Sequence, residues 1–186
     1  MEVMKKLVVV INGRSGVGKD SLIEHAANYY EVRRVSSVTP VKEAAMNVGW
    51  DGEKDEAGRR LLADLKAALV RYNDSPTKYC VGEYKKFKAV EQDIMFVHIR
   101  EPEEIAKFRE KVPCKTLLVI RDAAPEFKSL NTDNEAIKEF SYDYIFDNNR
   151  PWEEAGPAFL RLIEEMRGSG DSMELPLLVG LQLGNV

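Results

Sequence analysis

Short apolar runs alternate along the chain with longer segments in which apolar residues recur every three or four positions. A short apolar run bounded by turn residues is typical of a buried strand, whereas the three-to-four spacing is typical of an amphipathic helix. Because the two patterns take turns, we expect an α/β fold with a parallel sheet, right-handed crossovers and helices on both faces. The runs predict strands at residues 7–11, 31–36, 94–99, 115–120 and 142–146.

Helices are expected between the first four strands and after the last one. The longest covers residues 54–72, and its stripe of apolar side chains (Leu61, Leu62, Leu65, Leu69 and Tyr72) is suited to packing against the rest of the domain. Pro40, Pro76 and Pro102 mark the starts of three others, since proline is tolerated in the first turn of a helix. Apart from the longest helix, the helical patterns cover residues 19–29, 41–47, the segment after 73–76, 102–111 and a last segment that ends at Gly168.

The C-terminal tail, residues 169–186, is strongly apolar from residue 173 onward. An apolar segment of this kind needs cover, so we expect it to lie over an edge of the sheet or against a neighbouring subunit. The second arrangement would make the protein a homodimer through its tail.

A glycine-rich loop joins the first apolar run to the first helical segment. Its glycines let consecutive backbone N–H groups turn inward to form a nest for an anion, and the positive end of the next helix points at the same spot. Lys19, where the loop meets the helix, can place its ammonium between the β- and γ-phosphates of a nucleotide. The alternative is an ordinary strand–turn–helix junction. The pattern G-x-x-x-x-G-K predicts a P-loop that binds ATP through Gly13, Arg14, Ser15, Gly16, Val17, Gly18, Lys19, Asp20 and Ser21.

Composition narrows the kinds of protein that fit. A length of 186 residues suits one domain. The net charge of −4 at pH 7 leaves no polycationic surface, so we expect no polymeric nucleic acid as partner. Cys80 and Cys114 lack C-x-x-C spacing, which argues against a zinc site or a disulfide framework. Residues 1–11 superficially resemble a signal peptide, but their apolar run is too short and passes straight into the glycine-rich loop. No run reaches transmembrane length either, so we expect a cytoplasmic protein without membrane contact.

Polar side chains follow several of the expected strands directly. In open parallel sheets, ligands bind at the carboxyl ends of the strands. Residues at these positions are therefore better candidates for a site than polar residues elsewhere. They are Ser36, Arg100, Glu101, Arg121 and Asn148.

Several stretches of the chain resemble the P-loop deoxynucleoside monophosphate kinases of phages and bacteria, which are similar to adenylate kinases. Each stretch is short, and the resemblance rests on their order from the first strand to the final helix. Two further stretches, residues 134–135 and 143–148, also resemble dephospho-coenzyme A kinases. The main stretches are GKD at 18–20, PVK at 40–42, GWDGEK at 49–54, GRRLL at 58–62 and HIREPEE at 98–104.

The resemblance implies a fold and an activity. The fold is that of P-loop NTPases, with three α/β/α layers and a five-stranded parallel sheet, in a kinase domain that spans residues 1–168. A helical insertion for the nucleoside monophosphate would occupy about residues 37–92, and a short lid about residues 122–134. The activity is transfer of the γ-phosphoryl group of ATP, with Mg²⁺, to a nucleoside or deoxynucleoside monophosphate.

The resemblance also implies roles for individual residues. Arg59 would bind the acceptor phosphate, because a guanidinium matches phosphate oxygens in pairs, although a solvated helix arginine is the alternative. Arg150 would stack on the base of ATP, or else be a surface turn residue. Ser36, Thr39, Lys42 and Arg100 would line the acceptor pocket, with a helix cap as the alternative for the serine and the threonine.

The sequence departs from the family pattern in three places. The third strand of the family ends in an acidic residue, and His98 holds that position here, whereas Asp20 replaces the usual P-loop hydroxyl. Because Mg²⁺ prefers oxygen ligands, Asp20 and Glu101 are the candidate metal ligands. The lid also lacks arginine. The charge that develops during phosphoryl transfer would therefore be stabilised by Lys19, Arg100 and Arg121.

Two other functions stay open. The G-K-D loop also resembles that of animal phosphomevalonate kinases, so the acceptor can be another small molecule. A protein that binds nucleotides without chemistry is the second alternative, because the acidic residue at the end of the third strand is missing.

Overall fold

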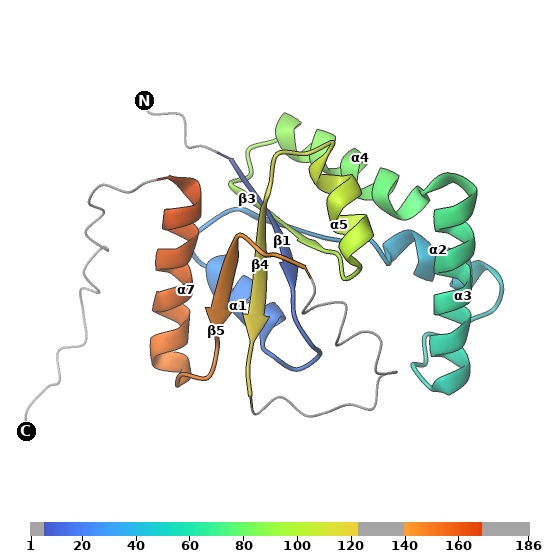
Figure 1. The fold of residues 1–186 in the computed structure, drawn as a ribbon, viewed down its shortest axis with the longest axis horizontal. Coiled ribbons are helices and arrows are strands. Elements are labelled where there is room, and N and C mark those ends of the chain that lie inside the picture. The colour runs from blue at the N-terminus through green and yellow to red at the C-terminus, as the bar shows by residue number, and fades with distance from the viewer. Residues whose placement is uncertain (1–5, 123–139, 169–186) are drawn as a thin grey trace, which may run out of the picture.

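The computed structural model describes residues 6–122 and 140–168 of the chain. They form a five-stranded, all-parallel sheet in the order β2-β3-β1-β4-β5 (Figure 1). The predicted α/β class and the predicted parallel sheet are therefore confirmed. The strands are β1 Leu7–Asn12, β2 Val32–Ser36, β3 Ile94–His98, β4 Lys115–Ile120 and β5 Tyr144–Asp147.

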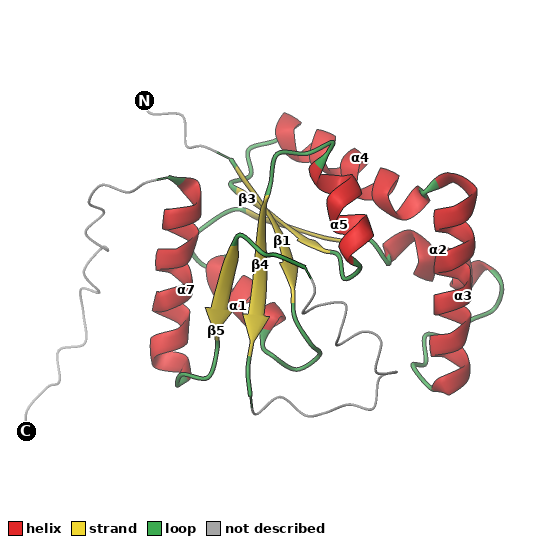
Figure 2. Ribbon diagram, viewed as in Figure 1, coloured by secondary structure: helices red, strands yellow, loops and turns green. Residues whose placement is uncertain are grey.

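Helices cover both faces of the sheet, which gives three layers (Figure 2). On one face lie α1 (Lys19–Ala26) and α7 (Trp152–Arg167). The other face carries α4 (Ser75–Ala89) and α5 (Pro102–Arg109). Figure 1 shows α2 (Thr39–Asn47) and α3 (Glu56–Asn73) at one side of the molecule, away from the sheet.

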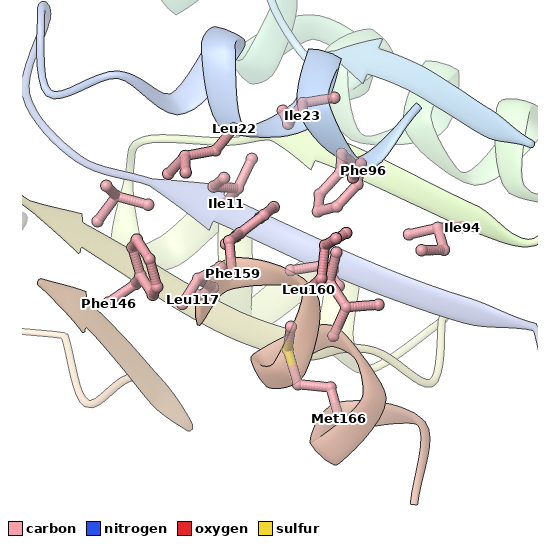
Figure 3. Packing of buried hydrophobic residues seen from close by; sticks show 14 of the residues in the cluster. Ile11, Leu22, Ile23, Ile94, Phe96, Leu117, Phe146, Phe159, Leu160 and Met166 are labelled. Carbon is pink, nitrogen blue, oxygen red and sulfur yellow. The ribbon is translucent and has the colours of Figure 1, made fainter. Parts of the chain in front are cut away.

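The core consists of two apolar clusters separated by the sheet. Alternate residues of β1 point to opposite faces, so Val9 and Ile11 join the cluster under α1 and α7, while Val10 joins the one under α4 and α5. Such continuous burial is expected for a central strand of a parallel sheet. In the first cluster the ring of Phe159 lies between Phe96 and Phe146, with ring centroids 6.2 Å and 5.4 Å away (Figure 3).

Predicted and observed elements differ mainly at their ends. Helix α1 ends at Ala26 rather than at residue 29, because the backbone N–H groups of Tyr29 and Tyr30 both donate to the Ala26 carbonyl and close the helix. Strand β5 begins at Tyr144 rather than at residue 142. The residue before it, Asp143, accepts hydrogen bonds from the backbone and hydroxyl of Thr116 instead of joining the ladder.

The prediction for the apolar stripe of α3 was wrong at Tyr72. This side chain is 84% exposed, and the four leucines of the stripe are only half-buried. Only Gly58 is buried in α3. The reason is tertiary, since α3 contacts α2 and α4 but does not lie on the sheet.

Three helices, α2, α3 and α4, lie between β2 and β3, where the sequence assigns the helical insertion. Of the expected lid, residues 122–134, only Asp122 is described, and the expected tail, residues 169–186, lies outside the described residues. Within the described ranges, no helix combines the length and the apolar character needed to cross a membrane.

Candidate functional site

The loop between β1 and α1 has a backbone course that depends on its glycines. Gly13, Gly16 and Gly18 have φ angles of +143°, +81° and +93°, which side chains disfavour. A Cβ atom on Gly13 would lie 2.4 Å from the carbonyl oxygen of Val119 in β4, so no larger residue fits there. Val17 is 1% exposed and packs into the core as the apolar anchor of the loop.

Lys19 is the first residue of α1 and reaches back over the loop. Its Nζ atom donates to the carbonyl oxygens of Gly13, at 2.6 Å, and of Arg14, at 2.8 Å. Burial and the nearby guanidinium of Arg100 lower the pKa of Lys19 to about 8, against the opposing effect of Asp20. An anion at this position would favour the charged lysine, so the electrostatics of the loop suit a phosphate.

Helix α1 starts without a capping side chain. Gly18 occupies the N-cap position, and no side chain in the described part of the chain caps the first turn. The first N–H groups of a helix have no partner within the helix, and an anion at a helix N-terminus can accept from them. Arg14, Ser15, Gly16, Asp20 and Ser21 are exposed around this helix start, so the predicted P-loop is accessible. The loop and the lysine together fit the phosphates of a nucleotide.

Two buried asparagines brace the loop from either side. Asn12, 1% exposed, accepts from the backbone N–H of Gly13 at 2.8 Å and donates to the Arg100 carbonyl oxygen at 3.0 Å and to the Tyr142 hydroxyl at 2.8 Å. Asn148 donates to the carbonyl oxygen of Val17 at 2.8 Å. Sequence reasoning singled out Asn148 as a strand-end residue but missed Asn12, whose position between an apolar strand and a glycine was the available signal.

The end of β3 faces the start of α1. The Nε2 atom of His98 lies 3.9 Å from Oδ1 of Asp20, so the two residues that depart from the family pattern lie next to each other. Burial lowers the pKa of His98, assisted by Lys19, Arg34 and Arg100 and opposed by Asp20. The imidazole is therefore neutral at pH 7. Arg100 follows two residues later and is exposed, and its positive charge lowers the pKa of both Lys19 and His98.

The candidate metal ligand Glu101 belongs to a different cluster. Lys66 of α3 makes ion pairs with Glu101 and with Glu104 of α5, the latter at 2.9 Å, and Ser37 donates to Glu104 at 3.4 Å. Burial alone would lower the pKa of Lys66, but the two carboxylates outweigh it and raise that pKa. Burial and Glu101 raise the pKa of Glu104, which is 4% exposed. Glu101 thus faces a lysine, and its role as metal ligand stays a prediction.

A cavity of about 300 Å³ lies between α3 and α5, directly beside this cluster. Lys66, Glu101 and Glu104 form part of its wall, which also contains three apolar residues and a further glutamate and lysine. Sequence reasoning missed Lys66, Ser37 and Glu104, although Glu104 falls within the HIREPEE stretch. The cavity borders the helical insertion, where the acceptor is expected. It is lined by Ala63, Lys66, Ala67, Val70, Glu101, Glu103, Glu104 and Lys107.

The other predicted residues lie at the carboxyl ends of strands or in the helices between β2 and β3. Ser36 pairs in register with His98, so it lies at the same edge. Thr39 and Lys42 lie in α2 and are half-buried, and Arg59 is exposed on α3. Arg121 is exposed directly after β4.

Arg150 lies in the short segment between β5 and α7. It lines a second cavity, of about 320 Å³, between β5 and α7. Asp147 and Arg161 line the same cavity. The expected contact of Arg150 with the base of ATP stays a prediction.

No protein-family model matches the chain, and no curated protein does either. Among solved structures, a sugar kinase from a Janibacter species is similar with a TM-score of 0.51 at 15% identity, covering 90% of this chain and 99% of that one. A presumed kinase from Chloroflexus aurantiacus has a TM-score of 0.52 at 13% identity, with 91% and 100% covered. The chain therefore has the fold of P-loop kinases.

Proposed function

We propose that this protein transfers the γ-phosphoryl group of ATP to a small acceptor, and that the acceptor is a nucleoside or deoxynucleoside monophosphate. The observation that carries the proposal is the loop after β1, where Lys19 is held by two loop carbonyls beside an uncapped helix start. Both features favour an anion with several oxygens. The kinase fold supports the same conclusion.

The residues of the loop have distinct tasks in this proposal. Backbone N–H groups after Gly16 bind phosphate oxygens, and Lys19 exchanges its bonds to carbonyl oxygens for bonds to the transferred phosphoryl group. Arg100 and Arg121, which follow the two strands on either side of β1, stabilise the charge that develops during transfer. Mg²⁺, when bound, would neutralise phosphate charge, and Asp20, in the first turn of α1, would be the carboxylate that holds it.

The acceptor would bind on the insertion side of the sheet. Ser36 is the last residue of β2, and Thr39 and Lys42 follow in α2. Arg59 lies on α3, which also borders the cavity beside Lys66. The guanidinium of Arg59 can donate two parallel hydrogen bonds to the phosphate of a monophosphate. The resemblance of this segment to nucleoside monophosphate kinases supports that acceptor class.

A second candidate is a kinase for a different small molecule. It is favoured by the similarity to a sugar kinase over nearly the full length of both chains. The mixed wall of the cavity, with three carboxylates and two lysines, also suits a neutral acceptor with hydroxyl groups.

The test is ADP release from ATP with a panel of acceptors that contains ribo- and deoxynucleoside monophosphates, sugars and phosphorylated alcohols. Lys19→Met keeps the length of the side chain and removes its charge, so turnover should fall about 10²–10³-fold. Lys85→Met, on the exposed face of α4, is the matched control. Turnover of a sugar alone would select the second candidate. ATP binding without ADP release for every acceptor would indicate a binding protein without chemistry.

A further inference from the structure

Two unusual residues meet at the loop of the proposed nucleotide site. Asp20 lies in the first turn of α1, and His98 is the last residue of β3. Their Nε2 and Oδ1 atoms are 3.9 Å apart, although the residues come from different elements. Strand β3 pairs with β1, which leads into the loop, so the sheet itself brings them together.

We propose that His98 and Asp20 form a mixed imidazole–carboxylate pair that binds a divalent transition-metal ion, such as Mn²⁺ or Co²⁺, together with the nucleotide phosphates and in preference to Mg²⁺. The inference rests on the proposed nucleotide site and adds the identity of the metal to it. It also assigns His98 a role as a metal ligand.

The geometry is close to that of a ligand pair. Ligand atoms lie about 2.1 Å from such an ion, so two ligands at right angles are about 3.0 Å apart. The pair must therefore approach by about 1 Å. The Asp20 side chain is 85% exposed and can rotate, whereas the His98 side chain is 26% exposed and held at the strand end. A movement of Asp20 alone would complete the pair.

The chemistry of the donors decides which ion is favoured. Mg²⁺ binds oxygen almost exclusively, whereas an imidazole nitrogen raises the affinity for first-row transition metals. A strand-end carboxylate would not discriminate in this way. The exchange of a carboxylate for His98 therefore predicts a change of metal preference.

The surroundings explain why the nucleotide is needed. Lys19, Arg34 and Arg100 place positive charge around His98 and oppose a free cation. Among the described residues, no group of three or more His, Cys, Asp or Glu side chains forms a metal site by itself. Phosphate oxygens would supply both the missing ligands and the negative charge. The free protein should accordingly bind the ion weakly.

The test uses Mn²⁺ and a non-hydrolysable ATP analogue with the full chain. Pulsed electron paramagnetic resonance detects a nitrogen bound to Mn²⁺ directly. We expect this nitrogen signal in the wild-type complex, its loss in His98→Asn and His98→Asp, and its retention in the control His25→Asn, whose ring lies between Tyr29 and Trp152. By calorimetry, the ratio of the Mn²⁺ to the Mg²⁺ affinity should fall at least about tenfold in both His98 variants.

The possible results separate this inference from the function it rests on. Binding of the analogue with Mn²⁺ but without a nitrogen signal would overturn the metal pair and leave the nucleotide site intact. An equal ratio of Mn²⁺ affinity to Mg²⁺ affinity in the wild type and in His98→Asp would overturn the metal pair as well. If the analogue did not bind with any metal, both the pair and the proposed function would be wrong.

Discussion

The ammonium of Lys19 is bonded to two loop carbonyls and lies near a second positive charge, that of Arg100. Its pKa of about 8 means that the free protein loses the Lys19 proton within an accessible pH range. The charged lysine is the form that attracts phosphate. The affinity of the loop for nucleotides should therefore depend on pH in a way that ordinary lysines, with pKa values near 10.4, do not produce.

The first prediction concerns this pH dependence. Because Lys19 titrates from charged to neutral as pH rises through about 8, the affinity for a non-hydrolysable ATP analogue should fall between pH 7 and pH 9.5. Calorimetric titrations across this range measure the effect. Lys19→Met should bind more weakly at pH 7 and show little further change. A wild-type affinity that stays constant to pH 9.5 would contradict the prediction.

The second prediction concerns Asn148, which is 6% exposed and donates to the carbonyl oxygen of Val17. Asn148→Ala leaves a buried loop carbonyl without this donor, a loss of about 1–3 kcal/mol. Unfolding in urea should show lower stability, and the affinity for the ATP analogue should fall because the loop loses a brace. Asn47→Ala, at the exposed end of α2, is the control and should match the wild type. Identical results for both variants would show that Asn148 does not brace the loop.

At the scale of elements, α3 depends on a small number of contacts. It has one buried residue, Gly58, close to the Trp50 ring nitrogen and the Glu53 carbonyl oxygen of the preceding loop. Two turns further along the helix, Lys66 joins it to α5 through Glu101 and Glu104. The Lys66 cluster is therefore the main polar link between the insertion and the helix that follows β3.

The third prediction is that Lys66→Met loosens this link in a pH-dependent way. Without the lysine, buried Glu104 is held near Glu101 with no cation, and its pKa rises further above the value in the unfolded chain. The native state then binds more protons than the unfolded state between the two pKa values, so stability falls as pH rises through that range. We expect a loss of about 2 kcal/mol at pH 8 and a smaller loss at pH 5.

Urea unfolding at the two pH values measures this loss. Lys85→Met is the control for removing an exposed lysine. The double variant Lys66→Met with Glu104→Gln should recover stability at pH 8, because the unpaired buried charge is gone. Equal losses for Lys66→Met at both pH values would mean that the lysine acts through packing of its hydrocarbon stem.

At the scale of the whole molecule, the sheet and the insertion differ in how firmly they are packed. All six residues of β1 are buried, and α7 buries seven of its residues, mostly against the sheet. By contrast, α3 lies at the side of the molecule and contacts other helices (Figure 1). Elements with few buried contacts open locally at a lower free energy than elements packed in the core.

The fourth prediction is a difference in local opening. Amide hydrogens of α3 should exchange through openings of lower free energy than those of α7, which has a similar length but packs on the sheet. Hydrogen exchange followed by mass spectrometry compares the two helices in one sample. The half-buried leucines of α3 predict measurable exchange while β1 stays protected. Exchange of α3 as slow as that of β1 would show that the insertion is part of the rigid core.

The sequence by itself determined the features that depend on neighbours along the chain. Apolar spacing placed all five strands to within about two residues, because buried strands of a parallel sheet are apolar on both faces. The glycine-rich loop was found because its φ angles need glycine at fixed spacings, and its lysine follows the last glycine directly.

Tertiary structure alone decided which distant residues meet. Three contacts join segments that are distant in the sequence and that the fold brings together. They are the contact of Asp20 with His98, the hydrogen bond from Asn148 to the Val17 carbonyl oxygen, and the ion pair of Lys66 with Glu104. The sequence could not predict that Tyr72 is exposed, because an apolar stripe shows that a helix can pack but not which elements lie beside it. Periodicity reports the local environment of one element, whereas these contacts depend on how separate elements are arranged in space.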